Sequence, residues 1–358
     1  MGTSIFFNEI LICYIEQSPI FPLTVTLAQG LLRISSIFYA TSWVIEEKKV
    51  DYRQKTLRDT VSCTGIGLHS GHRIRLTIKP SPPDTGITFV RKDLPGHPAV
   101  KAQPENVIDT NLSTTIGING CRVSTIEHIM AAFFGLGIDN ARVELDGPEV
   151  PIMDGSSAPF VFLIKSVGIK EQKNPKCFIV LKKALEISEG GRSVCLRPSS
   201  ELKISYTIDF HHPLLRNQSY ELCFSGKDFV NEISRARTFG FLKDIQTLWE
   251  NGLALGGSLD NAIVIDDFRI LNEDGLRYKD EFVRHKILDF IGDLAILGCP
   301  VIGHFVVEKS GHSLNQMVLR QLIEDQKLWE SVTFQNPEEC CLNSVKIPVF
   351  GSPDPVPA

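Results

Sequence analysis

Residue types that bind metal ions recur at one-turn spacing in the segment 284–293. His285, Asp289 and Asp293 follow one another at four-residue intervals among Ile, Leu and Phe residues, so on a helix they share one face. A histidine and a carboxylate one turn apart can both reach one Zn²⁺, which accepts nitrogen and oxygen ligands at about 2.0 to 2.2 Å. The spacing is also compatible with a surface His–Asp pair that contributes about 0.5 kcal/mol.

A second histidine with a neighbouring carboxylate occurs at Glu127 and His128. The pattern Ser124-x-x-Glu127 also matches a capping box, so a purely structural role for Glu127 stays open. Together, His128, His285 and Asp289 would supply three ligands and leave the fourth position of a tetrahedral zinc to water, as in catalytic sites. Glu127 would then be placed as a general base for that water.

A third histidine, His312, lies in the segment 309–313 (KSGHS), which predicts a strand-to-helix turn with Ser313 as the N-cap. A helix N-terminus would lower the pKa of His312, whereas a hydrogen bond to Asp293 would raise it, so the direction stays open. The alternative is a loop histidine that binds its own turn. We assign His304, in the preceding strand, to packing.

A hydroxyl and two aromatic rings occur together in the segment 236–244. At the start of a predicted helix, Thr238 could polarise a carbonyl, and Phe239 and Phe241 could stack on a ring. A helix cap with core phenylalanines is the alternative. The glycine-rich segment 64–71 lacks the P-loop lysine and the GxGxxG spacing, so it predicts a hairpin.

Two α+β halves are expected to position these residues. In the first half, residue periodicity predicts strands at 72–79 and 140–146 and helices at 124–136 and 156–167. In the second half, strands are expected at 178–181, 203–210, 262–266 and 301–308, with helices near 227–235, 241–251, 282–297 and 313–329. Charge, Asn and Pro in 171–176 predict a linker between the halves. No residue-level repeat is visible.

Composition places the chain among globular proteins. Its 358 residues, 43% of them hydrophobic, are enough for two domains. A net charge of −5 with scattered cations argues against a nucleic-acid partner. Nine cysteines without a Cys-x-x-Cys motif predict no disulfide framework and indicate a reducing, cytoplasmic compartment. The longest charge-free N-terminal stretch, 17–32, is too short to cross a bilayer, so no transmembrane segment is expected.

The expected organisation along the chain has four parts. Residues 1–54 are apolar without clear periodicity, fit neither a signal nor a transit peptide, and are expected to form an extension outside the fold. A first α+β domain at 55–173 and a second at 177–330 follow. The tail at 336–358, which ends in GSPDPVPA, is expected to be disordered.

Seven motifs occur in one order along the chain: TGIGLHSG, STIEHIMAAFFGLGIDN, PIMDGSSAPF, SRARTFGF, LGGSLDNAIV, LNEDGLRYKDEFVRHKILDFIGD and KSGHSLN. Over about residues 55–328 the chain therefore resembles the UDP-3-O-acyl-N-acetylglucosamine deacetylases, the zinc enzymes of lipid A biosynthesis. The resemblance implies an α+β fold of two similar domains, each a sheet packed on two helices. The helices would be sandwiched between the sheets, with the zinc site at the domain junction.

The resemblance also implies a role for each matching residue. Zn²⁺ would be bound by His128, His285 and Asp289, with Glu127 as the general base. His312, held by Asp293, would be the general acid or electrostatic partner, and Thr238 would stabilise the oxyanion. Contacts to sugar and nucleotide would come from Phe239, Phe241, Asp244, Lys286 and Lys309.

The implied reaction is hydrolysis of the N-acetyl group of UDP-3-O-(3-hydroxyacyl)-N-acetylglucosamine, the committed step of lipid A biosynthesis, by a monomer. An insert at about 257–278 would line an acyl tunnel with its apolar run 262–265. The segment 111–115 lacks a cysteine that some members carry, which leaves the ligand set intact. A zinc amidohydrolase for another acylated amino sugar, or an inactive homologue that binds a nucleotide sugar, is the alternative.

Overall fold

The computed structural model describes residues 52–335, 339 and 345–350. The described residues all belong to one compact unit, and residues 1–47 lie outside the described part of the chain. The first described strand begins at Arg53. Residues 53 and 54 therefore belong to the fold, although the sequence predicted a start at residue 55.

The first half is built on a five-stranded sheet with the order β2-β3-β9-β4-β5. Its strands β9 and β4 are parallel, and its other pairs are antiparallel. The elements of this half are β1 (Arg53–Leu57), β2 (Val61–Ile66), β3 (Arg73–Pro80), β4 (Ile87–Arg91), β5 (Ala99–Lys101), η1 (Pro104–Asn106), β6 (Val107–Asp109), β7 (Thr115–Ile118), β8 (Cys121–Val123), α2 (Glu127–Leu136), β9 (Ala141–Leu145), α3 (Ala158–Val167) and β10 (Ile169–Pro175).

The second half has a five-stranded sheet of the same topology, β12-β13-β19-β14-β15, with β19 and β14 parallel. The elements up to its first long helix are β11 (Cys177–Leu181), β12 (Leu185–Glu189), β13 (Arg192–Arg197), β14 (Lys203–Ile208), η2 (Pro213–Leu215), β15 (Gln218–Cys223), α4 (Gly226–Asp228), η3 (Phe229–Ile233), β16 (Phe239–Phe241), η4 (Leu242–Asp244), α5 (Ile245–Glu250) and β17 (Ile263–Ile265). They are followed by α6 (Glu281–Ala295), β18 (Val301–Ile302), β19 (His304–Glu308), α7 (His312–Glu324), η5 (Gln326–Leu328) and β20 (Trp329–Thr333).

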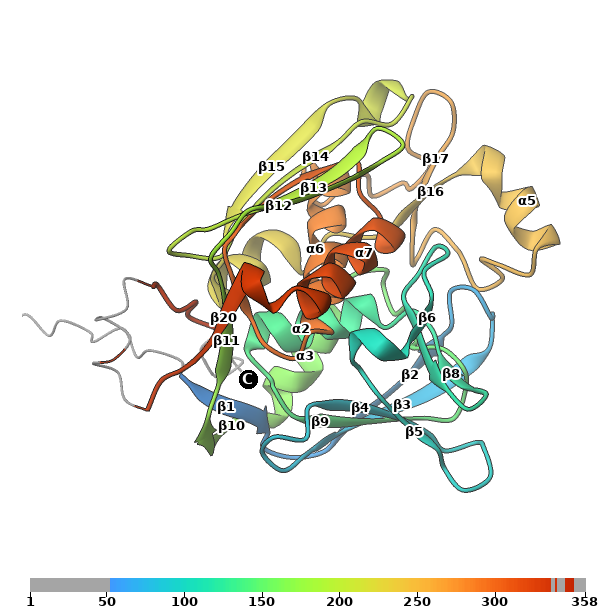
Figure 1. Cartoon of the computed structure of the whole chain (residues 1–358). Coiled ribbons are helices and arrows are strands. Elements are labelled where there is room, and N and C mark those ends of the chain that lie inside the picture. The colour runs from blue at the N-terminus through green and yellow to red at the C-terminus, as the bar shows by residue number, and fades with distance from the viewer. Residues whose placement is uncertain (1–51, 336–338, 340–344, 351–358) are drawn as a thin grey trace, which may run out of the picture. The chain divides into compact units, whose positions relative to one another are not determined.

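The two halves are therefore structural duplicates, which confirms the predicted α+β fold. In each half, four strands of the five-stranded sheet precede a long helix (α2 or α6), this helix precedes the central strand of the sheet, and a second long helix follows. Helices α2, α3, α6 and α7 lie between the two five-stranded sheets, with α6 and α7 against the second sheet (Figure 1). Among the described residues, all strand pairing stays within one half.

Alternating burial explains why the predicted strands form. In β3, Ile74, Leu76 and Ile78 are fully buried, whereas Arg73 and Arg75 between them are exposed. The hairpin β2–β3 encloses the glycine-rich segment 64–71, as predicted. The predicted strand 301–308 is divided at Gly303 into β18 and β19, which join two different sheets.

Three sequence expectations are corrected by the structure. The expected linker 171–176 lies largely in β10, which pairs antiparallel with β1 and leaves most of its polar side chains at least partly exposed. Residues 345–350 of the expected disordered tail are packed, with Phe350 buried against Phe134 and Phe224. The helix expected at 227–235 is a short α-helical turn, α4, continued by the π-helical turn η3.

No helix in the described part of the chain is long and apolar enough to cross a bilayer. The described cysteines, Cys63, Cys121, Cys177, Cys195, Cys223 and Cys299, are unpaired. The segment 17–32 and the remaining three cysteines lie outside the described residues.

Candidate metal centre and catalytic site

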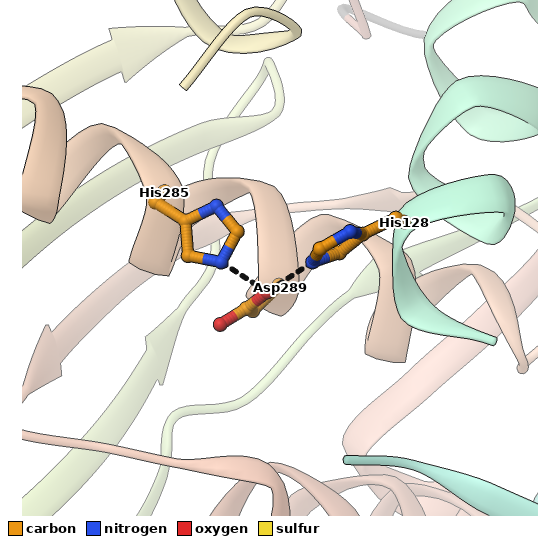
Figure 2. Close-up of side chains that lie close together, drawn as sticks. All are labelled: His128, His285 and Asp289. Atoms are coloured by element: carbon orange, nitrogen blue, oxygen red, sulfur yellow. Dashed lines mark ion pairs between the residues drawn. The ribbon is translucent and has the colours of Figure 1, made fainter. Parts of the chain in front are cut away.

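The three predicted metal ligands meet where α2 packs against α6. His128 is the second residue of α2, and His285 and Asp289 lie one turn apart on α6. Figure 2 shows the two imidazoles directed at the Asp289 carboxylate from different helices. Gly292 allows this approach, because a Cβ at that position would collide with the backbone carbonyl of Glu127.

The separations of the ligand atoms suit a tetrahedral ion. His285 Nε2 lies 3.3 Å from Asp289 Oδ1, and His128 Nε2 lies 3.5 Å from the same oxygen. One ligand atom from each residue lies within 4.8 Å of the others. Tetrahedral ligands at about 2.0 to 2.2 Å from a Zn²⁺ are separated by about 3.3 to 3.6 Å, so the donor set fits this ion.

The protonation of His285 also favours a cation at this position. Its Nδ1 donates to the Ala236 carbonyl oxygen at 3.0 Å, which leaves the Nε2 lone pair facing Asp289. Burial lowers the pKa of His285 to about 4, so the ring is neutral at pH 7. A lone pair and a carboxylate oxygen, both acceptors, thus face each other in a buried site, an arrangement that a metal cation stabilises. His128 Nδ1 is buried without a hydrogen-bond partner among the described residues.

The predicted base and acid lie beside this group. Glu127 Oε1 is 4.0 Å from His312 Nε2, and both side chains are more than nine-tenths buried. Burial raises the pKa of Glu127 above its usual range, which makes the carboxylate a better proton acceptor near neutral pH. Glu127 Oε2 accepts a hydrogen bond of 3.0 Å from the backbone N–H of Thr114. The capping box that the sequence left open as an alternative for Glu127 is absent, because the N-cap of α2 is Ile126 and no side chain caps it.

The hydrogen bond to Asp293 determines the charge of His312. His312 is the first residue of α7, after the N-cap Gly311, so Ser313 is not the predicted N-cap. His312 Nδ1 donates to Asp293 Oδ2 at 2.9 Å. Burial favours the neutral ring, but Asp293, with help from Glu127, raises the pKa of His312 to about 9. Burial is the largest single effect, but Asp293, Glu127 and Asp289 together exceed it, and His312 is an imidazolium at pH 7.

Two residues that the sequence reasoning missed complete the environment of Asp293. Thr114 Oγ1 donates to Asp293 Oδ1 at 2.6 Å, and Asn315 Nδ2 donates to Oδ2 at 2.7 Å. Asn315 follows His312 by three residues on α7, a spacing that could have suggested a shared helix face. Thr114 lies 179 positions from Asp293, so no local pattern connects the two.

The backbone just before α2 has an unfavourable conformation. Thr125 has φ of 58°, a left-handed value that β-branched residues rarely adopt. Its hydroxyl donates to Glu149 Oε1 at 2.9 Å, and the Glu149 carboxylate also accepts the backbone N–H groups of His69 and Ser70. These bonds hold the glycine-rich hairpin to the turn that presents Glu127. His69, Ser70 and Glu149 line a polar cavity of about 360 Å³, which the sequence reasoning also missed.

Thr238 and Phe239 directly follow the segment whose Ala236 carbonyl binds His285. The backbone N–H of Thr238 donates to the Gly155 carbonyl at 2.8 Å. The adjacent Arg237 is fixed by a buried ion pair with Glu281, at 2.9 Å, which holds the segment that supplies the Ala236 carbonyl. The Phe239 ring lies 6.3 Å from the His285 ring.

The other predicted substrate residues are less closely connected. Lys286 donates to Asp289 Oδ2 at 2.8 Å and so belongs to the metal group. Phe241 packs against Phe210, Asp244 is exposed at the end of η4, and Lys309 is paired with Asp209. No hydrogen bond, ion pair or ring contact of the described residues joins these last three to the metal group.

Apolar side chains of the predicted insert are divided between core and surface. Ile263 and Ile265 of β17 are fully buried, so this predicted apolar run forms part of the core, with Ala262 and Val264 partly exposed. The exposed apolar side chains lie on both sides of it, at Leu242, Trp249, Leu255, Leu259 and Phe268. A larger cavity of about 570 Å³, at the C-terminal ends of α2, α6 and α7, is lined by none of the predicted site residues.

Comparison with known proteins identifies close relatives. The family model described as UDP-3-O-acyl N-acetylglycosamine deacetylase matches residues 54–324. A UDP-3-O-acyl-N-acetylglucosamine deacetylase of Myxococcus xanthus is 54% identical over 281 residues, which cover 78% of this chain and 90% of the relative. The protein of that name from Thioalkalivibrio sulfidiphilus is 54% identical over 299 residues, or 83% of this chain and 98% of the relative.

Proposed function

Because the chain belongs to the UDP-3-O-acyl N-acetylglycosamine deacetylase family, we propose that it catalyses zinc-dependent hydrolysis of an N-acetyl group. The substrate would be UDP-3-O-(3-hydroxyacyl)-N-acetylglucosamine, and the products would be acetate and the free amine, in lipid A biosynthesis. The observation that carries this proposal is the His128, His285 and Asp289 donor set beside a carboxylate and an imidazolium.

The three ligands would hold the zinc ion through His128 Nε2, His285 Nε2 and Asp289 Oδ1. When bound, Zn²⁺ supplies Lewis-acid polarisation of a carbonyl oxygen and allows water to act as a nucleophile near neutral pH. Lys286 keeps Asp289 oriented through a 2.8 Å hydrogen bond to its second oxygen. The Ala236 carbonyl likewise fixes the ring of His285.

Glu127 and His312 would move the protons of the hydrolysis. Oε1 of Glu127 accepts a proton from the attacking water, because Oε2 is already bound by the Thr114 N–H. His312 donates the proton on Nε2 to the leaving amine nitrogen, since its Nδ1–H is bound to Asp293. The hydroxyl of Thr238 would donate to the developing oxyanion. Water and amide are thereby converted to acetate and amine without a redox step.

Substrate recognition would use the residues around this centre. The Phe239 ring, close to His285, is suited to stack on a sugar, and Phe241, Asp244 and Lys309 would contact more distant parts of the nucleotide sugar. The exposed apolar side chains Leu242, Leu255 and Leu259 would contact the acyl chain. The unpaired cysteines support a reducing, cytoplasmic location.

The proposal is tested by acetate release from the UDP-3-O-(3-hydroxyacyl)-N-acetylglucosamine substrate, with purified full-length chain and measured metal content. We expect turnover with about one zinc per chain, loss of turnover with a chelator, and recovery when zinc is added back. Substrates with shortened acyl chains should react more slowly. Bound zinc without turnover would point to another acylated amino sugar, and a chain that binds no zinc would refute the site.

A further inference from the structure

Thr114 is a buried residue whose polar groups all have partners near the catalytic site. It is fully buried just before β7, in the segment 111–115. Its carbonyl accepts the N–H of Ile126, the N-cap residue of α2, at 3.3 Å. The backbone of Thr114 is therefore attached to the beginning of the helix that carries Glu127 and His128.

The N–H of Thr114 restrains the base. It donates to Glu127 Oε2 at 3.0 Å, which leaves Oε1 as the oxygen that faces His312 Nε2. A hydrogen bond to one carboxylate oxygen fixes the rotation of the whole carboxylate. The N–H therefore selects the oxygen of Glu127 that is free to accept a proton.

The hydroxyl of Thr114 restrains the group that holds the acid. It donates to Asp293 Oδ1 at 2.6 Å and lies 3.3 Å from His312 Nδ1. Asp293 Oδ2 accepts hydrogen bonds from both His312 and Asn315. Among the described residues, the side-chain hydroxyl of Thr114 is the donor to the other oxygen, Oδ1. Without it, the carboxylate could rotate about its own axis and carry the imidazolium with it.

From these contacts we infer that Thr114 is a positioning residue that sets the separation between the base, Glu127, and the acid, His312. The inference rests on the proposed hydrolysis. That reaction needs both groups at one amide, the base toward water and the acid toward nitrogen, and the groups come from different halves of the chain. Thr114 connects them through two bonds that start from atoms of one residue, so the distance between the base and the acid is fixed locally.

The hydroxyl can be removed without changing the backbone bonds. Thr114→Val keeps the shape, the N–H and the carbonyl, and Thr114→Ser keeps the hydroxyl. Thr115→Val is the matched control: Thr115 is also buried, and its hydroxyl makes no hydrogen bond among the described residues. Each full-length variant is measured for kcat, KM, zinc content and thermal unfolding.

We expect kcat of Thr114→Val to fall by about tenfold to hundredfold, with KM changed by less than about threefold and zinc content unchanged. Thr114→Ser should recover most of kcat, and Thr115→Val should behave as wild type. If wild type turns over and Thr114→Val keeps its kcat, the inference is wrong while the proposed function stands. Equal loss in the Val and Ser variants would also overturn it, because packing rather than the hydroxyl would then be responsible. An inactive wild type would instead refute the proposed function.

Discussion

The charge of His312 depends mainly on the Asp293 carboxylate, and this dependence gives the most specific test of the proposed acid. Asp293→Asn replaces that carboxylate with a neutral group of the same shape and leaves the metal ligands unchanged. Burial lowers the pKa of His312, but Asp293, with smaller contributions from Glu127 and Asp289, raises it to about 9. The substitution removes the largest contribution that opposes burial and leaves only the weaker ones of Glu127 and Asp289, so the pKa is expected to fall to about 6.5 or below.

The size of the effect follows from the protonated fraction of His312. A group with a pKa of about 9 is about 97% protonated at pH 7.5, whereas one with a pKa of 6.5 is about 9% protonated. At pH 7.5 the variant should therefore have a kcat at least about tenfold lower than wild type. The sign follows because a raised pKa extends the protonated, proton-donating form to higher pH. Loss of the Asp293 charge moves the alkaline limb of the pH profile to lower pH. The activity of the variant should therefore partly recover near pH 6.

The assay is kcat for acetate release between pH 5 and 10, with zinc content and thermal unfolding measured on the same samples. A variant that binds zinc and unfolds like wild type but loses activity on the alkaline side supports His312 as the acid. An alkaline limb at the same pH in both proteins would show that it does not come from His312. A uniform loss of kcat at every pH would refute the charge argument, because it would mean that Asp293 acts only by orienting the ring.

Three further changes test other parts of the structure. His285→Ala should reduce bound zinc below one per chain, measured by metal analysis, because it removes one of three ligands; full zinc content would contradict the ligand set. Gly292→Ala should lower both activity and the unfolding temperature, since its Cβ would collide with the Glu127 carbonyl. Lys176→Met should reduce the free energy of unfolding in urea by about 3 kcal/mol, because it leaves Asp139 buried without its 2.8 Å partner; a loss below about 1 kcal/mol would contradict this.

The regular elements around the site were largely predictable from local sequence patterns. The four-residue spacing of His285, Asp289 and Asp293 on a helix is borne out by α6, and the glycine after residue 136 ends α2 in a left-handed conformation. The alternation in 72–79 likewise predicted β3. In each case the periodicity of the buried face determines the element, and a single sequence is sufficient to reveal it.

The failures arose where a partner distant in sequence decides the structure. Residues 171–176 have the composition of a linker, but 171–175 lie in β10 because they pair with β1. Lys176 is buried because it forms an ion pair with Asp139. Phe350 lies in a proline-rich C-terminal segment, yet it packs against Phe134 and Phe224. Local composition contains no information about such partners.

The capping box at Ser124 and Glu127 failed for a related reason. The motif requires the glutamate to bind backbone at its own helix start, but Glu127 binds the N–H of Thr114 from a preceding segment. The helix start is stabilised differently, through the Thr114 carbonyl and the Ile126 N–H. The capping-box pattern is therefore present in the sequence, but the Glu127 carboxylate binds the distant Thr114 N–H instead of its own helix start.

The duplicated fold explains why the site contains side chains from both halves. Helices α2 and α6 occupy equivalent positions in the two halves and pack against each other between the sheets. Neither helix alone supplies the metal ligands, since His128 comes from α2 and His285 and Asp289 come from α6. Every change in the packing of α2 on α6 must therefore change the ligand geometry as well. Gly292 makes this dependence direct. It lies on α6 between Asp289 and Asp293, and it contacts the backbone of Glu127, the proposed base.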